Sequence, residues 1–145
     1  MRKVLSAVFT AIAAVVLFSN AAIAAPTADF SAQVVYYVNI ERENTGLSPL
    51  TWDEGMTPAT TMRAEEASRF FSHTRPDGSP WYAADTSRLY GENLAKGYDD
   101  AAAVVTAWMN SPKHRENILS SAFTTVNVQY VCGADGITYI AEEFG

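Results

Sequence analysis

Apolar residues recur at helical spacing soon after residue 28. Phe30, Val34 and Val38 share one side of a helix that begins there. Asp29 fits the N-cap position in front of this run, where a short polar side chain accepts a bond from a free amide. The segment 44–46 (Asn-Thr-Gly) then ends the helix, because glycine adopts the left-handed conformation found just past a helix end.

Three more helices are predicted further along the chain. The dipeptides Thr-Pro at 57–58 and Ser-Pro at 111–112 each place a capping hydroxyl before a proline, whose missing N–H is tolerated in a first turn. They predict a helix from 57 to about 71 and a short helix from 111 to 119. Between these two, apolar residues at helical spacing predict a helix that begins near Asp99.

The C-terminal region changes its period from helical to alternating. Apolar and polar residues alternate over 126–132, which is typical of a half-buried strand. Asp-Gly at 135–136 is a hairpin turn signal, and residues 137–144 form the returning strand. Helices first and an antiparallel hairpin last indicate a layered α+β domain.

The N-terminal segment has the features of a secretion signal. Arg2 and Lys3 precede an uncharged apolar run over 4–18, and Ala-Ile-Ala at 22–24 is the small-x-small pattern that a signal peptidase cleaves. The run is shorter than the roughly 20 residues that a membrane-spanning helix needs. We therefore expect cleavage after Ala24 and a secreted or cell-surface-associated product with no transmembrane anchor. The alternative is a buried N-terminal helix.

The predicted domain organisation is simple. A signal peptide occupies 1–24, a short tail 25–28 and one domain 29–145, since the remaining chain suffices for a single core. Loss of the signal removes two of the 10 basic residues and none of the 16 acidic ones, which leaves a net charge of −8. Such an acidic chain argues against nucleic acid as a partner, because phosphate binding draws on clustered Lys and Arg.

Cys132 is the single cysteine of the chain, so no internal disulfide can form. We expect it to be buried and inert in its strand. The alternative is that it pairs with a cysteine of another chain.

Three segments suggest candidate chemistry and a family. His73 opens His-Thr-Arg-Pro-Asp-Gly, Glu92 lies in Gly-Glu-Asn, and His114 follows Trp-Met-Asn-Ser-Pro-Lys. Supporting motifs are Val38-Asn39, Arg42, Leu50-Thr51-Trp52-Asp53 and Phe144-Gly145. In this order and spacing the chain resembles the SCP-like extracellular branch of the CAP superfamily (cysteine-rich secretory protein, antigen 5, pathogenesis-related). The match covers about residues 30–145 and is of a cysteine-poor, bacterial-looking type.

The resemblance implies a three-layer α-β-α sandwich with a small antiparallel sheet and a cleft lined by histidines and acidic residues. His73, Glu92 and His114 match three of the family's four cleft residues. The fourth is usually a glutamate, and Ser111 stands at that position. The chain lacks the cysteine framework and the cysteine-rich extension of eukaryotic members, so the toxin-like roles of those extensions are not carried over.

A divalent metal is one hypothesis for this cleft. Two imidazoles and one carboxylate, here His73, His114 and Glu92, suit zinc or a similar ion. The three residues are far apart in sequence, so this hypothesis rests on the resemblance. The alternatives are structural: Glu92 could pin a loop by accepting backbone amides, His114 could pack in its helix, and His73 could meet the carbonyls of the preceding helix.

Ser111 supports a second, weaker hypothesis of hydrolysis, with His114 as base and Glu92 as orienting acid. We instead expect its hydroxyl to cap the next helix by accepting a bond from the amide of His114 or its neighbour. Trp81 and Tyr82 lie in the loop that follows His73 along the chain. They could stack on a glycan, cover a lipid, or simply anchor their own loop.

The sequence thus predicts a secreted protein whose cleft (His73, Glu92, Ser111 and His114) binds a ligand, namely a lipid, glycan, peptide or other small molecule, with or without a divalent metal. Two alternatives stay open. The same cleft could perform metal-assisted or acid–base hydrolysis, or it could be vestigial in a structural cell-surface protein. The family has no single agreed activity, so the fold alone does not choose between them.

Overall fold

A four-stranded sheet with the order β1-β3-β4-β2 runs through the middle of the protein. The computed structural model describes residues 29–145, so the predicted signal peptide and tail lie outside the described residues. The strands are β1 (Thr51–Trp52), β2 (Gly91–Lys96), β3 (Thr125–Cys132) and β4 (Thr138–Phe144). β4 pairs antiparallel with both β2 and β3, whereas the short β1 runs parallel to β3.

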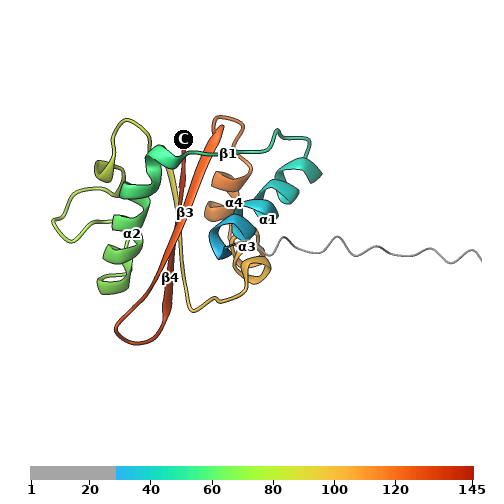
Figure 1. Ribbon diagram of the computed structural model, residues 1–145. Coiled ribbons are helices and arrows are strands. Elements are labelled where there is room, and N and C mark those ends of the chain that lie inside the picture. Colours follow the sequence, from blue (N-terminus) through green and yellow to red (C-terminus); the bar gives the residue numbers. More distant parts are fainter. Residues whose placement is uncertain (1–28) are drawn as a thin grey trace, which may run out of the picture.

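The helices cover both faces of this sheet. α2 (Thr57–Arg69) lies on one face, and α1 (Phe30–Asn44), α3 (Ala101–Met109) and α4 (Pro112–Ile118) lie on the other, as Figure 1 shows. Two short 3₁₀ turns, η1 (Glu54–Met56) and η2 (Trp81–Ala84), flank α2 and the loop after it. The predicted three-layer α-β-α sandwich is confirmed, with a sheet that is mixed because of β1. Within residues 29–145, no helix is long and apolar enough to cross a membrane.

The helix boundaries follow the predicted signals within a few residues. α1 ends where Gly46 takes a φ of 79°. α3 begins at Ala101, two residues after Asp99, because the carboxylate of Asp100 caps the helix by accepting the amide of Ala103 at 2.7 Å. Thr57 lies inside α2 and not in front of it, since η1 leads directly into the helix. Asp29 takes the N-cap position of α1, but its carboxylate accepts the hydroxyl of Tyr130 at 3.1 Å.

Strands β1 and β2 were not predicted. β2 is an edge strand in which five of six residues are buried, so it lacks the alternation that marks a half-exposed strand. Its outer edge is covered by side chains from the helices beside it. Asn117 donates to the carbonyl of Glu92 at 3.0 Å, and the indole of Trp108 donates to the carbonyl of Leu94 at 3.1 Å.

The larger apolar core lies between the sheet and α1, α3 and α4. Its members are fully or nearly fully buried aliphatic and aromatic residues: Val34, Val38, Leu50, Ala95, Ala101, Val104, Val105, Trp108, Ile118, Val126, Val128, Ile140 and Phe144. The face toward α2 has a smaller cluster, Ala64, Ala67, Leu94, Tyr139 and Ala141. Alanines on α2 let the helix approach the sheet closely. Between them, Arg63 is completely buried.

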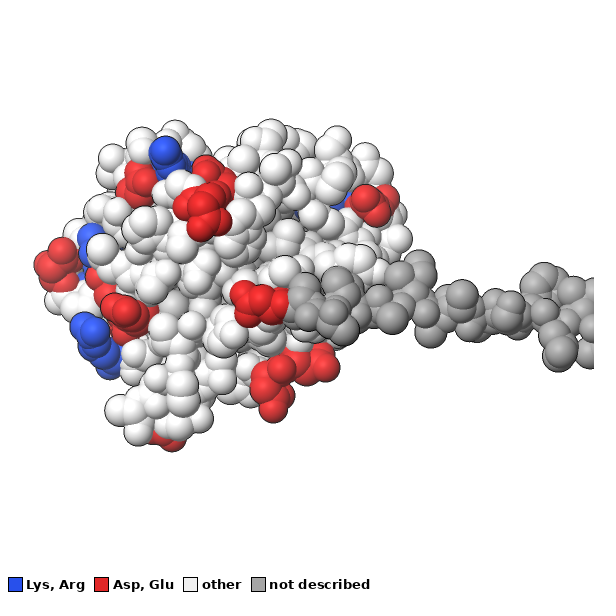
Figure 2. All heavy atoms as spheres, viewed as in Figure 1, with Lys and Arg blue, Asp and Glu red and all other residues white. Residues whose placement is uncertain are grey.

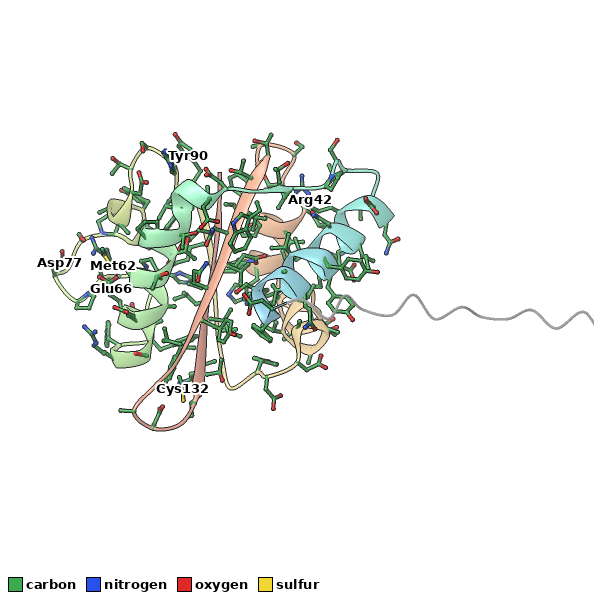
Figure 3. The ribbon with its side chains drawn as sticks, in the orientation of Figure 1. Arg42, Met62, Glu66, Asp77, Tyr90 and Cys132 are labelled. Atoms are coloured by element: carbon green, nitrogen blue, oxygen red, sulfur yellow. The ribbon has the colours of Figure 1, made fainter. Side chains whose placement is uncertain are left out.

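Cys132 is exposed, so the prediction of a buried cysteine is wrong. It is the last residue of β3, near the tip of the β3–β4 hairpin (Figure 3), where Gly136 makes the predicted turn with a φ of 77°. The predicted alternation is only partly correct: Val126 and Val128 are fully buried, but so is Asn127 between them. Tyr130 and Cys132 on the same face are exposed, although the ring of Tyr130 lies edge-on to Phe30 of α1.

Candidate functional site

A cleft with a volume of about 730 Å³ opens beside the outer edge of β2. The loop after α2 and the turn η2 supply one wall, through His73 and Trp81. α4 supplies the opposite wall, and Glu92 on β2 lies between the two. The structure thus brings His73, Glu92, Ser111 and His114, the four residues named from the sequence, to the lining of one cleft.

Glu92 is held by an arginine that the sequence analysis did not single out. The guanidinium of Arg63 donates to both oxygens of Glu92, at 2.7 and 3.2 Å, and both side chains are fully buried. The same guanidinium donates to the carbonyl of Ser72 at 2.8 Å, just before His73. Arg63 therefore fixes both the carboxylate in the cleft and the chain segment that carries the first histidine.

His73 is the partner of Glu92 on the solvent side. Its ring nitrogen Nδ1 lies 2.7 Å from Oε1 of Glu92, while the imidazole is about half exposed. An ionised carboxylate can only accept hydrogen bonds, so Nδ1 must carry the proton in this contact. The neutral ring then presents an unprotonated Nε2 that is free to act as an acceptor or a base.

The protonation of Glu92 follows from its neighbours. Burial raises the pKa of Glu92, but the hydrogen bonds from His73 and Arg63 and the charge of Arg63 outweigh it and hold that pKa below its ordinary value. Glu92 is therefore ionised at neutral pH. A second network member, Glu66, accepts from Arg63 and from Arg75, which ties the loop after α2 to the helix.

Glu143, on the neighbouring strand β4, is the residue paired with Glu92 of β2. It is fully buried, and neither of its carboxyl oxygens accepts a hydrogen bond from the described residues, although the carboxyl group lies within hydrogen-bonding reach of Glu92. Burial and the adjacent negative charge of Glu92 raise the pKa of Glu143 well above its ordinary value. One arginine thus faces two buried carboxyl groups, of which Glu92 keeps the charge and Glu143 keeps its proton.

Ser111 does not cap α4, so that prediction is wrong. Ser111 does occupy the N-cap position, but within the described chain its hydroxyl accepts no bond from a helix amide. Oγ lies instead 2.8 Å from Nδ1 of His114, one turn further along. The imidazole outcompetes the backbone for the hydroxyl because the two side chains lie on the same face of the helix.

His114 is neutral at physiological pH. Partial burial lowers its pKa, and electrostatic repulsion between the protonated forms of His73 and His114 lowers it further. The carbonyl of His114 accepts from Asn93 at 3.2 Å, and this amide also donates to buried Glu142 at 2.9 Å. α4 is thereby attached to β2, which fixes the distance between the two walls of the cleft.

The cleft does not fit a three-residue metal site. Both oxygens of Glu92 are already bonded, to Arg63 and His73, and its side chain is inaccessible. Within residues 29–145, no group of three or more His, Cys, Asp or Glu side chains is arranged to hold a metal ion. Glu92 is therefore unsuited to be a ligand in this arrangement, and the binding of zinc or a similar ion in the cleft stays a prediction.

Two aromatic residues line the cleft beside the histidines. Trp81 packs against the small buried cluster of Met56, Ala59 and Leu89, and its amide donates to the carbonyl of His73 at 3.0 Å. It thus anchors its loop and also lines the cleft. Tyr90, labelled in Figure 3, lines the cleft and has 63% of its surface exposed. Tyr82 is exposed but does not line the cleft.

The sequence analysis missed Arg63 and Glu143. Arg63 occupies the interior face of α2, four residues after Ala59 and four before Ala67, which are both buried. A charge inside such a stripe of small residues is the signal that could have identified it. Glu143 offers a similar signal, since it lies in a strand of continuous burial.

Comparison with known proteins identifies relatives. A model of the CAP family, described as the cysteine-rich secretory protein family, matches residues 35–143. The Bacillus subtilis protein YkwD is 37% identical over 109 residues, which cover 70% of this chain and 42% of YkwD. The chain therefore spans less than half the length of that relative.

Two solved structures share the fold. An outer surface protein from Borrelia burgdorferi has a TM-score of 0.67 at 24% identity, covering 77% of this chain and 88% of that protein. An extracellular SCP-domain protein from Bacillus anthracis has a TM-score of 0.66 at 24% identity, covering 79% and 40% of the two chains. At this identity the likeness establishes the arrangement of helices and strands alone.

Proposed function

We propose that this chain, which belongs to the CAP family of cysteine-rich secretory proteins, is an extracellular binding protein whose cleft holds a glycan. The observation that carries the proposal is the lining of the cleft, where Trp81 and Tyr90 accompany two imidazoles. Aromatic faces pack on the C–H faces of sugars, and neighbouring polar groups bond their hydroxyls. The exposed Nε2 of His73 and the hydroxyl of Ser111 are suited to that second role.

The cleft suits a glycan better than a lipid or a peptide. A lipid requires a continuous apolar lining, whereas this one includes Glu116, Asn117 and Lys113. A peptide would bind most simply as an added strand along β2. That mode is blocked where Asn117 and Trp108 already occupy the outward carbonyls of the strand.

A titration followed by NMR tests the proposal. The ¹⁵N-labelled protein, recovered from culture medium, is titrated with chitohexaose and with hexagalacturonate. We expect at least one of these oligosaccharides to shift the indole signal of Trp81 and the amide of Gly91 in a saturable manner. Tyr90→Ala should weaken binding about fivefold, as expected for one lost aromatic contact.

Tyr130→Ala is the matched control, because Tyr130 is also exposed but lies outside the cleft and packs against Phe30 of α1. It should leave the affinity unchanged. If neither oligosaccharide shifts any signal of the cleft, the proposal is overturned.

One observation favours a second candidate, ester hydrolysis. The hydroxyl of Ser111 is free of the helix and hydrogen-bonded to the neutral imidazole of His114 at 2.8 Å. Attack by Oγ on an ester carbonyl would pass the hydroxyl proton to Nδ1 of His114 and then to the departing alcohol, and water would release the acid. A fluorophosphonate probe should then label Ser111, as detected by mass spectrometry. An unlabelled Ser111 removes this candidate.

A further inference from the structure

A second hollow lies on the other side of α4. It has a volume of about 540 Å³ and lies between the end of α3 and the outer face of α4. Met109 and Leu119 supply its apolar lining, and Arg115 supplies a charge. Pro112 and Glu116 line both this hollow and the cleft. The two hollows are therefore neighbours, separated by α4 as a ridge.

Helix geometry assigns the side chains of α4 to the two sides of this ridge. Residues four apart lie on one face of a helix. Pro112 and Glu116 form the crest, since both hollows share them. Lys113 lines the cleft alone, and Arg115 lines the second hollow alone. A positive side chain thus stands on each side of the ridge, with one negative side chain between them.

These two cations form no ion pair within the described residues, a property that they share with Arg42, Arg88 and Lys96. Of the eight Lys and Arg residues from 29 to 145, Arg63, Arg69 and Arg75 bind glutamates, and Arg42 is buried against backbone carbonyls. The remaining four are Arg88, Lys96, Lys113 and Arg115. Two of these four lie on α4 beside the hollows. On the face that Figure 2 shows, most side chains are uncharged, and acidic groups are more frequent than basic ones.

We propose that the ligand is an acidic glycan that crosses α4, with carboxylates beside Lys113 in the cleft and beside Arg115 in the second hollow. This inference rests on the proposed function and specifies its ligand. A helix with its side chains is about 10–12 Å across, so a ligand that reaches both hollows is a chain of several sugars. Glu116 on the crest repels a carboxylate there and so favours a register with acidic groups on either side.

The experiment compares two ligands that differ only in charge. Hexagalacturonate carries the carboxylates, and its methyl ester has the same length and stereochemistry without them. Calorimetry at low and at moderate salt gives the affinity of each ligand. We expect the acid to bind more tightly than the ester, with a difference that shrinks as salt rises.

Two variants of the ridge sharpen the test. Arg115→Gln should weaken binding of the acid about threefold and leave the ester unchanged, as for the loss of one exposed charge contact. Glu116→Gln should strengthen binding of the acid, because it removes the repulsion on the crest. Arg88→Gln is the control, because Arg88 is an exposed cation that lines neither hollow, and it should leave the preference for the acid unchanged.

The outcomes separate this inference from the proposed function. Equal affinity for the acid and the ester, or an acid preference that Arg115→Gln leaves intact, overturns the acidic ligand while glycan binding stands. Equal weakening by Arg88→Gln would show general attraction to a polyanion and would also overturn the inference. If neither ligand binds and chitohexaose also fails, the proposed function itself falls.

Discussion

The two faces of the sheet are built from different chemistry. Toward α1, α3 and α4 the interior is mainly aliphatic and aromatic, from Val34 to Phe144. Toward α2 the interior contains small alanines and a buried charge network of Arg63, Glu92 and Glu143. The first face stabilises the fold by removing apolar surface from water. The second face brings a fixed carboxylate to the cleft.

The difference between the two faces indicates that the protein accepts the cost of burying charges on the face toward α2. Buried ion pairs seldom stabilise a protein more than apolar residues of the same volume would. The arrangement around Arg63 is therefore better explained by the geometry that it gives to Glu92 and His73 than by stability. The aliphatic face supplies the stability that lets the charged face persist.

Removal of the charge at Arg63 should lower the free energy of unfolding more than any other change considered below. Arg63→Met preserves volume but leaves two buried carboxyl groups without a cation, so we expect a loss of about 3–5 kcal/mol in the free energy of unfolding. Urea denaturation measures it. Arg69→Met is the control, because Arg69 makes only an exposed pair with Glu65 at 3.9 Å. If Arg63→Met lowered the free energy of unfolding as little as Arg69→Met, the buried charge network of Arg63, Glu92 and Glu143 would be dispensable for stability.

A cavity on the opposite face should reduce stability without reaching the cleft. Ile140 is fully buried in the aliphatic core, and Ile140→Ala should lower the free energy of unfolding by about 2–5 kcal/mol. The imidazole signals of His73 should stay unchanged in NMR spectra of the folded variant. A shift of those signals as large as that caused by Arg63→Met would contradict the division between the faces.

Glu142 gives a prediction about pH. Burial raises its pKa to about 8, so this carboxyl stabilises the fold fully only below its ordinary pKa of 4.5, and the contribution is lost as pH rises through 8. Glu142→Gln cannot ionise. At pH 9 it should be more stable than the wild type by on the order of 5 kcal/mol, with no gain near pH 4. Thermal unfolding across this range checks the prediction, and a gain that is independent of pH would refute it.

The smallest effect on the free energy of unfolding is expected for substitution of Ser111. Its hydroxyl binds His114 and not a helix amide, so Ser111→Ala should change the free energy of unfolding by less than about 0.5 kcal/mol. Asp100→Ala is the matched comparison, because Asp100 does cap α3 and should lose about 1 kcal/mol. Denaturation of both variants tests the pair. Equal losses would mean that Ser111 caps its helix after all.

The sequence predicted the helices and the terminal hairpin because their periodicity is strong. It did not predict β2, since a strand buried on both faces has no alternation and Gly91–Lys96 includes three polar residues. The four cleft residues came from the family motifs. Arg63 and Glu143 did not, because charges are expected at the surface unless a partner distant in sequence is known. The burial of Cys132 was predicted wrongly because alternation indicates which face of a strand a residue is on, but not how far along the strand the packed helices cover that face.

The account depends on one contact, in which buried Glu92 holds the imidazole of His73. Long-range ¹H–¹⁵N NMR spectra of the histidine rings test this contact directly, at a pH where His73 is neutral. The account predicts a proton on Nδ1 and an unprotonated Nε2 facing the cleft, because ionised Glu92 can only accept at 2.7 Å. A proton on Nε2, or rapid averaging between the two tautomers, would contradict it.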